Sequence, residues 1–132
     1  MTQLALALLA ASAAHHLPPG MLSAVCYVES HHANGAIHVK DGKGDSLGAC
    51  QIKLATARSL GYKGSKGALR YHASTNTFWA AKYLSKQLKR YKGSVRMATA
   101  AYNAGTCSQD KKGKIRNSKY VYKVFIAWAE GR

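Results

Sequence analysis

Acidic side chains are scarce in this chain of 132 residues. It has five Asp and Glu against 20 Lys and Arg, which gives a formal net charge of +15. So strong an imbalance implies a polyanionic partner or surface, such as nucleic acid, anionic lipid or an acidic wall polymer. The charge is uneven, because only Lys40 and Lys43 among the basic residues precede Lys53. The N-terminal third is therefore nearly neutral.

The chain also lacks low-complexity runs and internal repeats, while 47% of its residues are hydrophobic. This composition excludes an intrinsically disordered chain and a repeat array. A length of 132 residues suits one domain that is large enough to bury a core. We therefore expect a single domain over residues 1–132.

Paired metal-binding motifs are absent as well. The three cysteines, Cys26, Cys50 and Cys107, include no Cys-x-x-Cys pair, and none of the six histidines belongs to a His-Glu-x-x-His pattern. We expect neither a bound metal nor a cofactor. The cysteines are compatible with one disulfide and one free thiol, or with three buried thiols, and Cys26 is most simply a small core residue.

Residues 1–15 are apolar and rich in alanine and leucine. They lack the basic start of a signal peptide, and they are too short for a membrane span. Leu4, Leu8 and Ala11 recur at helical spacing. We expect a buried first helix of the domain, with a cleaved signal as the alternative.

One acidic residue stands alone near the N-terminus. Histidine aside, Glu29 is the only charged side chain among residues 1–39. Pro18 and Pro19 favour a helix start, after which Leu22, Val25 and Glu29 share one helical face. Apolar surroundings and the negative end of the helix dipole both raise the pKa of a carboxyl group there. Such an acid is suited to general acid catalysis, whereas the alternative is a Glu that faces water.

Hydrophobic periodicity predicts a mainly α-helical domain with at most a small β-hairpin. Beyond the Glu29 helix, the expected helices cover about 53–60, 74–91, 95–102 and 119–130. The expected loops cover 62–67 and 106–118, and a strand over 36–39 begins the hairpin. In the long helix, Phe78 and Leu84 belong to the expected apolar stripe, and Ser74 or Thr75 is its expected cap.

Four short motifs follow one another along the chain. They are Glu29-Ser30, Gly48-Ala49-Cys50-Gln51, Ala101-Tyr102-Asn103-Ala104-Gly105 and Tyr120-Val121. In this order they resemble the lytic transglycosylase (Slt-type, lysozyme-like) family of peptidoglycan-cleaving enzymes. Asn76 also matches a family asparagine. The resemblance covers about residues 17–125 and implies a mainly α, lysozyme-like fold in which residues 1–15 form the leading helix.

The resemblance implies cleavage of the β-1,4 bond between N-acetylmuramic acid and N-acetylglucosamine. A single acid, here Glu29, would protonate the leaving oxygen and then take a proton from the C6 hydroxyl of the sugar, giving a 1,6-anhydro end. By the same resemblance, the residues that would orient the site or bind the sugar are Ser30, Gln51, Tyr102, Asn103 and Tyr120. For the two tyrosines, core packing with a hydrogen-bonded hydroxyl is the alternative.

The chain departs from the family pattern at its cysteines, and two other functions are alternatives to a lytic transglycosylase. Ala49-Cys50 replaces the hydrophobic pair usual inside Gly-x-x-Gln, and a bridge between Cys50 and Cys107 is conceivable. A hydrolysing muramidase would need a second carboxylate, for which Asp45 or Asp41 is the candidate. A basic nucleic-acid-binding module would explain the lysine clusters, although no recognition-helix, zinc or RNP-type signature accompanies them.

The expected partner is the glycan strands of peptidoglycan. We expect the enzyme to be a monomer and to have no nucleic-acid partner. The net charge of +15 also suits attraction to an anionic outer-membrane or wall surface. We expect action outside the cytoplasm, by a phage lysin released at lysis or by a small secreted or periplasmic wall-remodelling enzyme.

Overall fold

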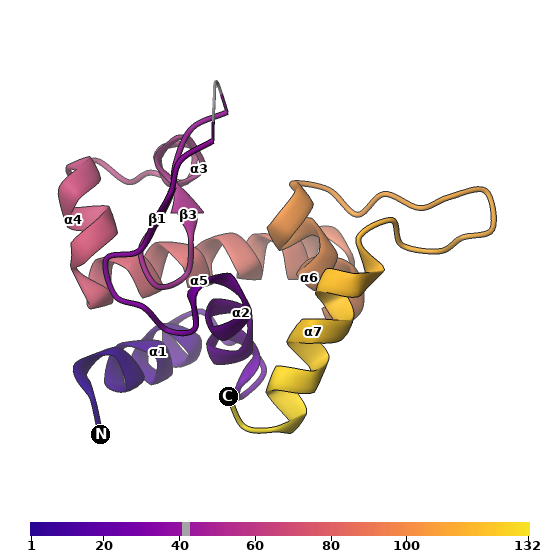
Figure 1. Cartoon of the computed structure of the whole chain (residues 1–132), viewed down its shortest axis with the longest axis horizontal. Helices are drawn as coiled ribbons and strands as arrows, with labels where there is room; N and C mark the ends of the chain where they lie inside the picture. Colours follow the sequence, from indigo (N-terminus) through magenta and orange to yellow (C-terminus); the bar gives the residue numbers. More distant parts are fainter. Residues whose placement is uncertain (41–42) are drawn as a thin grey trace.

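Helices dominate the computed structural model of the chain, which describes residues 1–40 and 43–132 (Figure 1). The helices are α1 (Gln3–Ala14), α2 (Met21–Ser30), α3 (Leu54–Ser59), α4 (Lys66–Tyr71), α5 (Ala73–Arg90), α6 (Val95–Ala104) and α7 (Ser118–Ala129). The strands are β1 (Ile37–His38), β2 (Ser46–Leu47) and β3 (Ile52–Lys53). The mainly α, lysozyme-like fold expected from the sequence is confirmed.

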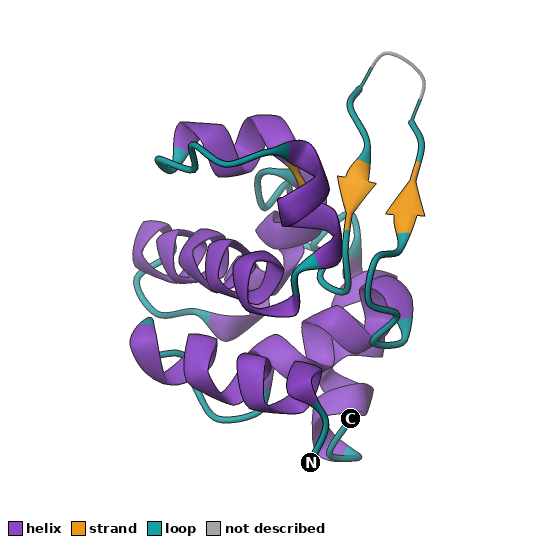
Figure 2. Ribbon diagram, turned by 90° about the vertical axis from the view of Figure 1, so that its left-hand side faces the viewer, coloured by secondary structure: helices purple, strands orange, loops and turns teal. Residues whose placement is uncertain are grey.

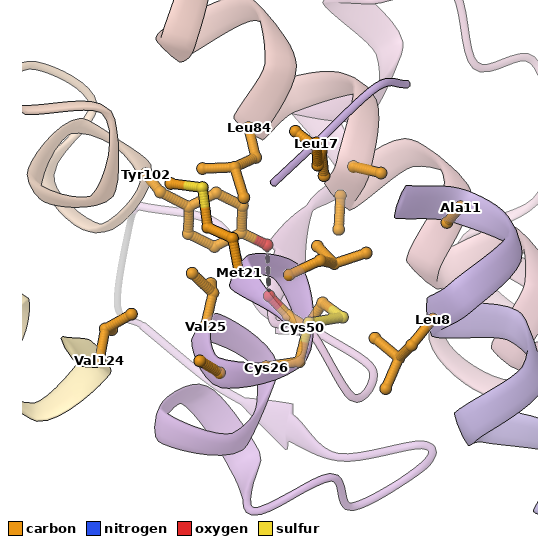
Figure 3. Close-up of a cluster of buried hydrophobic side chains, with 14 of the residues drawn as sticks. Leu8, Ala11, Leu17, Met21, Val25, Cys26, Cys50, Leu84, Tyr102 and Val124 are labelled. Carbon is orange, nitrogen blue, oxygen red and sulfur yellow. Dashed lines mark hydrogen bonds between the residues drawn. A yellow bond between two sulfur atoms is a disulfide. The ribbon is translucent and has the colours of Figure 1, made fainter. Parts of the chain in front are cut away.

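Helix α2 lies at the centre of the hydrophobic core, between α1, α5 and α7 (Figures 1 and 3). Its fully buried side chains are Met21, Leu22, Ala24, Val25 and Cys26. Burial of a leucine or valine side chain contributes about 1.5–3 kcal/mol relative to leaving it exposed. Because α2 is anchored along this face, the position of its last turn, which carries Glu29, is fixed.

The start of α2 differs from the prediction. The helix begins at Met21, so Pro18 and Pro19 lie in the preceding turn. The N-cap residue is Gly20, with a φ of 85° and the Trp128 indole so close that a Cβ would lie 2.9 Å from its Nε1. Glycine is favoured here because the backbone is left-handed and leaves no room for a side chain.

The first helix packs on α5, as expected for part of the domain. Leu8 and Ala11 are 5% and 4% exposed, and they face the core. Helix α5 differs from the prediction at two points. Phe78 is 39% exposed and lies edge-on to His15, outside the buried stripe. His72 is the N-cap residue, so Ser74 and Thr75 lie inside the first turn.

The expected hairpin is formed by β1 and β2, and β3 extends it to a three-stranded antiparallel sheet in the order β1-β2-β3 (Figure 2). Leu47 pairs with both Ile37 and Ile52. Helix α4 was not predicted. Leu69 is its buried residue, and Ser65 caps it by accepting a hydrogen bond from the Ala68 amide at 3.0 Å. One buried apolar residue in six is too little for a periodic signal.

A buried asparagine fixes the turn between β2 and β3. Asn76 of α5 accepts a hydrogen bond from the Cys50 amide at 2.9 Å and donates to the carbonyl oxygens of Leu47 and Leu69, both at 2.8 Å. Gly48 has a φ of 76°, and a Cβ on it would lie 2.1 Å from the Asn76 amide nitrogen. The turn therefore requires glycine at this position and asparagine opposite it.

A disulfide joins Cys26 of α2 to Cys50 of the same turn (Figure 3). Of the two arrangements that the sequence allowed, one disulfide with one free thiol is the one observed. Cys26 is thus half of a cystine, and a bridge from Cys50 to Cys107 is excluded because Cys50 is already bonded. Within the described residues, Cys107 is a free, partly exposed cysteine.

None of the helices over residues 1–40 and 43–132 combines the length and apolar character that crossing a membrane requires.

Candidate active site

Glu29 lies in the last turn of α2, where its carboxyl group is half-buried. The Tyr120 hydroxyl of α7 donates a hydrogen bond of 2.6 Å to Glu29 Oε2. Two helices from opposite ends of the chain therefore hold this carboxyl group in place. The expected position at the C-terminal end of an apolar helix face is the observed one.

Burial raises the pKa of the Glu29 carboxyl group above its ordinary value, because water is withdrawn from the charged form. The Tyr120 hydrogen bond and the positive charge of Lys40 oppose this shift, since both favour the carboxylate. The net direction is upward. The group therefore keeps its proton to a higher pH than an exposed glutamate, and a nearby donor holds its geometry.

Two motif residues hold the turn that follows β2, and one of them, Ser30, joins it to α2. The Ser30 hydroxyl donates to the Ala49 carbonyl oxygen at 2.6 Å and accepts from the Ala33 amide at 3.0 Å. Gln51 has a φ of 54°, and its side-chain amide donates to the Gly48 carbonyl oxygen at 3.0 Å. Both side chains thus fix the backbone beside Glu29.

Helix α6 supplies the opposite wall through Tyr102 and Asn103. Tyr102 is 7% exposed, and its hydroxyl donates to the Cys50 carbonyl oxygen at 2.6 Å (Figure 3). Burial, followed by the nearby Glu29 charge, raises the pKa of Tyr102 well above its ordinary value, so this hydroxyl stays protonated. Asn103 is exposed, and its side-chain oxygen accepts from Asn117 at 3.0 Å.

A cavity of about 170 Å³ opens in front of Glu29. Gln51, Tyr102 and Asn103 line it together with Glu29, so the cavity brings together four of the residues predicted from the sequence. Ser30 and Tyr120 support these residues without lining the cavity. Residues from α2, the sheet and α6 therefore converge on one cleft.

Asp45, the candidate second carboxylate, does not line this cavity. It forms an ion pair with Lys66 at 2.9 Å at the start of α4. The Lys66 hydrogen bond lowers the pKa of the Asp45 carboxyl group, so the group is ionised at neutral pH. Asp41, the other candidate, lies outside the described residues.

The cleft also contains residues that the sequence did not single out. They are Lys40, Ser46, Ile52, Lys53, Thr56 and Tyr83. Strand alternation does not reveal Lys53, because Gln51 has a φ of 54° and lies in the turn before β3. Asn117 carried no local signal either, since it reaches Asn103 only through the chain reversal between α6 and α7.

A larger cavity of about 870 Å³ lies elsewhere, between α1, the start of α2 and the C-terminal residues. Its lining is largely apolar and includes Leu4, Leu8, Leu17 and Pro19. Among the residues described, its lining holds no Asp or Glu side chain. The smaller cleft, with its half-buried acid, is therefore the better candidate for catalysis.

Fold and cleft together define the class of the protein. In the part of the chain that the structure describes, a helical, lysozyme-like domain presents one protonatable side-chain carboxyl group, that of Glu29, in a cleft lined by uncharged side chains and two lysines. A carboxyl group that keeps its proton in such a cleft can act as the general acid in the cleavage of a glycosidic bond.

Comparison with known proteins gives the family. The sequence model of the family described as Transglycosylase SLT domain matches residues 7–125, so the chain belongs to this family. Protein IpgF of Shigella flexneri is 28% identical over 115 residues, which span 85% of this chain and 74% of that protein. Protein IpgF of Shigella sonnei matches to the same extent. The resemblance is confirmed, and the chain is a peptidoglycan-acting enzyme that cleaves glycosidic bonds.

Proposed function

We propose that the chain is a lytic transglycosylase that cleaves the MurNAc-β-1,4-GlcNAc bond and leaves 1,6-anhydro-MurNAc ends. The observation that carries the proposal is the half-buried carboxyl group of Glu29, held by Tyr120 in a cleft that Asp45 does not line. One acid with a raised pKa is what a mechanism without a second carboxylate needs.

In this mechanism Glu29 works twice. Its protonated carboxyl group gives a proton to the glycosidic oxygen as the bond to the anomeric carbon breaks, while the N-acetyl carbonyl of the sugar assists at that carbon. The resulting Glu29 carboxylate then takes the proton of the C6 hydroxyl group, and the C6 oxygen bonds to the anomeric carbon. Glu29 ends protonated, and no water is consumed.

The remaining motif residues take two roles. Asn103 and Gln51 line the cleft, where they bind the sugar's hydroxyl and N-acetyl groups. Ser30, Tyr102 and Tyr120 are positioning residues, because their hydroxyl groups are already bonded to Ala49, Cys50 and Glu29. A positioning role for Tyr102 is supported by its near-complete burial.

Mass spectrometry of digested peptidoglycan tests the reaction type. We expect anhydro-ended muropeptides, which lack one water (about 18 Da) relative to hydrolysed ends. The matched variant Asp45→Asn should give the same products, since its carboxylate is paired with Lys66. Hydrolysed ends alone, together with a loss of activity in Asp45→Asn, would identify a hydrolysing muramidase instead.

Tyr120→Phe should shift the alkaline limb of the pH–rate profile to higher pH. The Tyr120 hydrogen bond favours the ionised form of Glu29 and lowers its pKa. Its removal raises that pKa, so the catalytic proton is retained to higher pH, while looser positioning lowers the maximal rate. Tyr122→Phe is the matched control, because Tyr122 is on the same helix and 67% exposed. An alkaline limb that stays in place would contradict this role.

The setting of the reaction is part of the proposal. Peptidoglycan glycan strands are the substrate, which places the enzyme's action outside the cytoplasm. The net charge of +15 supports attraction to an anionic wall or outer-membrane surface. We also propose that the enzyme acts as a monomer.

A further inference from the structure

Two lysines line the cleft beside Glu29 and have no role in the mechanism above. Lys40 follows β1 and is exposed, while Lys53 ends β3 and is half-buried. Both come from the sheet side of the cleft, which faces the uncharged wall of α6. Lys40 is close enough for its charge to lower the pKa of Glu29.

The positive charge of these two lysines is not compensated within the described structure. Ion pairs there join Lys66 to Asp45 and Arg132 to Glu130, and neither involves Lys40 or Lys53. The only acid among the described residues of the lining is Glu29, which must be protonated when catalysis begins. A cleft lined by charge of one sign concentrates ligands of the opposite sign.

The repeating sugars of the substrate are neutral, except for the charged groups attached to the muramic acid residues. Its lactyl group ends in a carboxyl, which in the intact wall is joined by an amide bond to a peptide with carboxylates of its own. We propose that Lys40 and Lys53 bind carboxylates carried by the muramic acid residues, and so select anionic glycan over neutral glycan. A lysine amine on a flexible stem can follow a carboxylate whose position varies, unlike the rigid fork of arginine.

This inference rests on the proposed function, and it is tested with three forms of one glycan preparation. The first form keeps its peptides. In the second, a carbodiimide and methylamine convert all carboxylates to neutral amides. In the third, an amidase removes the peptides and leaves the lactyl carboxylate. Rates are taken from soluble products separated by chromatography, for the wild type and for the double variant Lys40→Gln/Lys53→Gln.

The wild type should show a kcat/KM roughly tenfold higher on the untreated form than on the amidated form, and added salt should reduce this ratio. In Lys40→Gln/Lys53→Gln the ratio should fall toward one. The control Lys63→Gln/Lys86→Gln changes two exposed lysines outside the cleft and gives the same net charge, and its ratio should match the wild type.

The amidase-treated form identifies the source of the carboxylate. If the wild type prefers the amidase-treated form to the amidated form, and Lys40→Gln/Lys53→Gln does not, the lysines bind the lactyl carboxylate. If the wild type prefers only the untreated form, the lysines bind carboxylates of the peptide. An unchanged ratio in Lys40→Gln/Lys53→Gln would overturn the inference and leave the proposed function intact. A wild type that cleaves none of the three forms would instead remove the proposed function, and this inference with it.

Discussion

Glu29→Gln should lower the rate of peptidoglycan cleavage at least roughly 100-fold, because a positioned general acid contributes two to four orders of magnitude. Glutamine keeps the shape of the side chain and can still accept the Tyr120 hydrogen bond, but it has no proton to give. The measurement is the rate of wall lysis with purified peptidoglycan. Glu130→Gln is the matched control, since Glu130 is exposed and pairs only with Arg132.

Lysis at the native rate by Glu29→Gln would refute the catalytic role of this residue. Retention on immobilised DNA, measured on the same samples, separates the enzyme from a basic nucleic-acid-binding module. Glu29→Gln leaves the net positive charge high, so any DNA retention should be unchanged while lysis is lost. A chain whose only activity is DNA retention would favour the binding module.

The same substitution should not weaken the fold. The pKa of Glu29 is raised in the folded protein, so the stabilisation of the protonated form is complete below the unfolded pKa and is lost as pH rises through the folded pKa. A neutral glutamine avoids that loss. At neutral pH and above, Glu29→Gln should therefore unfold at the same or a higher denaturant concentration than the wild type. If Glu29→Gln lost activity and also unfolded at a lower denaturant concentration, the loss would be due to a destabilised fold and not to the missing acid.

Replacing Cys26 and Cys50 together by alanine should lower the free energy of unfolding by about 3 kcal/mol. The two residues are 24 apart in sequence, and the crosslink restricts the unfolded chain over that loop. The measurement is equilibrium unfolding in urea. The matched control is Cys107→Ala, which removes a cysteine without removing the crosslink.

Reduction of the wild type with a dithiol should lower its stability by an amount similar to that seen in Cys26→Ala/Cys50→Ala, and should leave the variant unchanged. A double variant as stable as the wild type would show that the crosslink contributes little. Activity measured well below the unfolding midpoint then reports whether the disulfide also positions Glu29, which lies three residues after Cys26.

The helices and the motif residues were predictable because both leave local patterns. Periodicity located α5 and α7 to within a residue or two, and the buried face of α2 placed Glu29 at its end. The disulfide was not predictable, because three cysteines allow several pairings and Cys26 on an apolar helix face fits a buried thiol equally well. Phe78 was misplaced because the apolar residues of α5 extend beyond its buried stripe.

Contacts that depend on tertiary structure were equally out of reach. Nothing local indicates that Asn76 would accept from Cys50, or that Asp45 would pair with Lys66 across 21 residues. Lys53 was equally out of reach, because the cleft that it lines is formed by segments far apart in the sequence. Long-range placement is therefore what the structure adds to the sequence.

Residues 48–51 form a single turn to which three helices are attached. The Ala49 carbonyl accepts from Ser30, the Cys50 amide and carbonyl bind Asn76 and Tyr102, and the Cys50 sulfur is bonded to α2. The geometry of the cleft depends on all three helices, so the cleft cannot unfold locally by the fraying of one helix end. The walls of the cleft should therefore unfold together in one cooperative transition. This transition should coincide with unfolding of the hydrophobic core beneath the cleft.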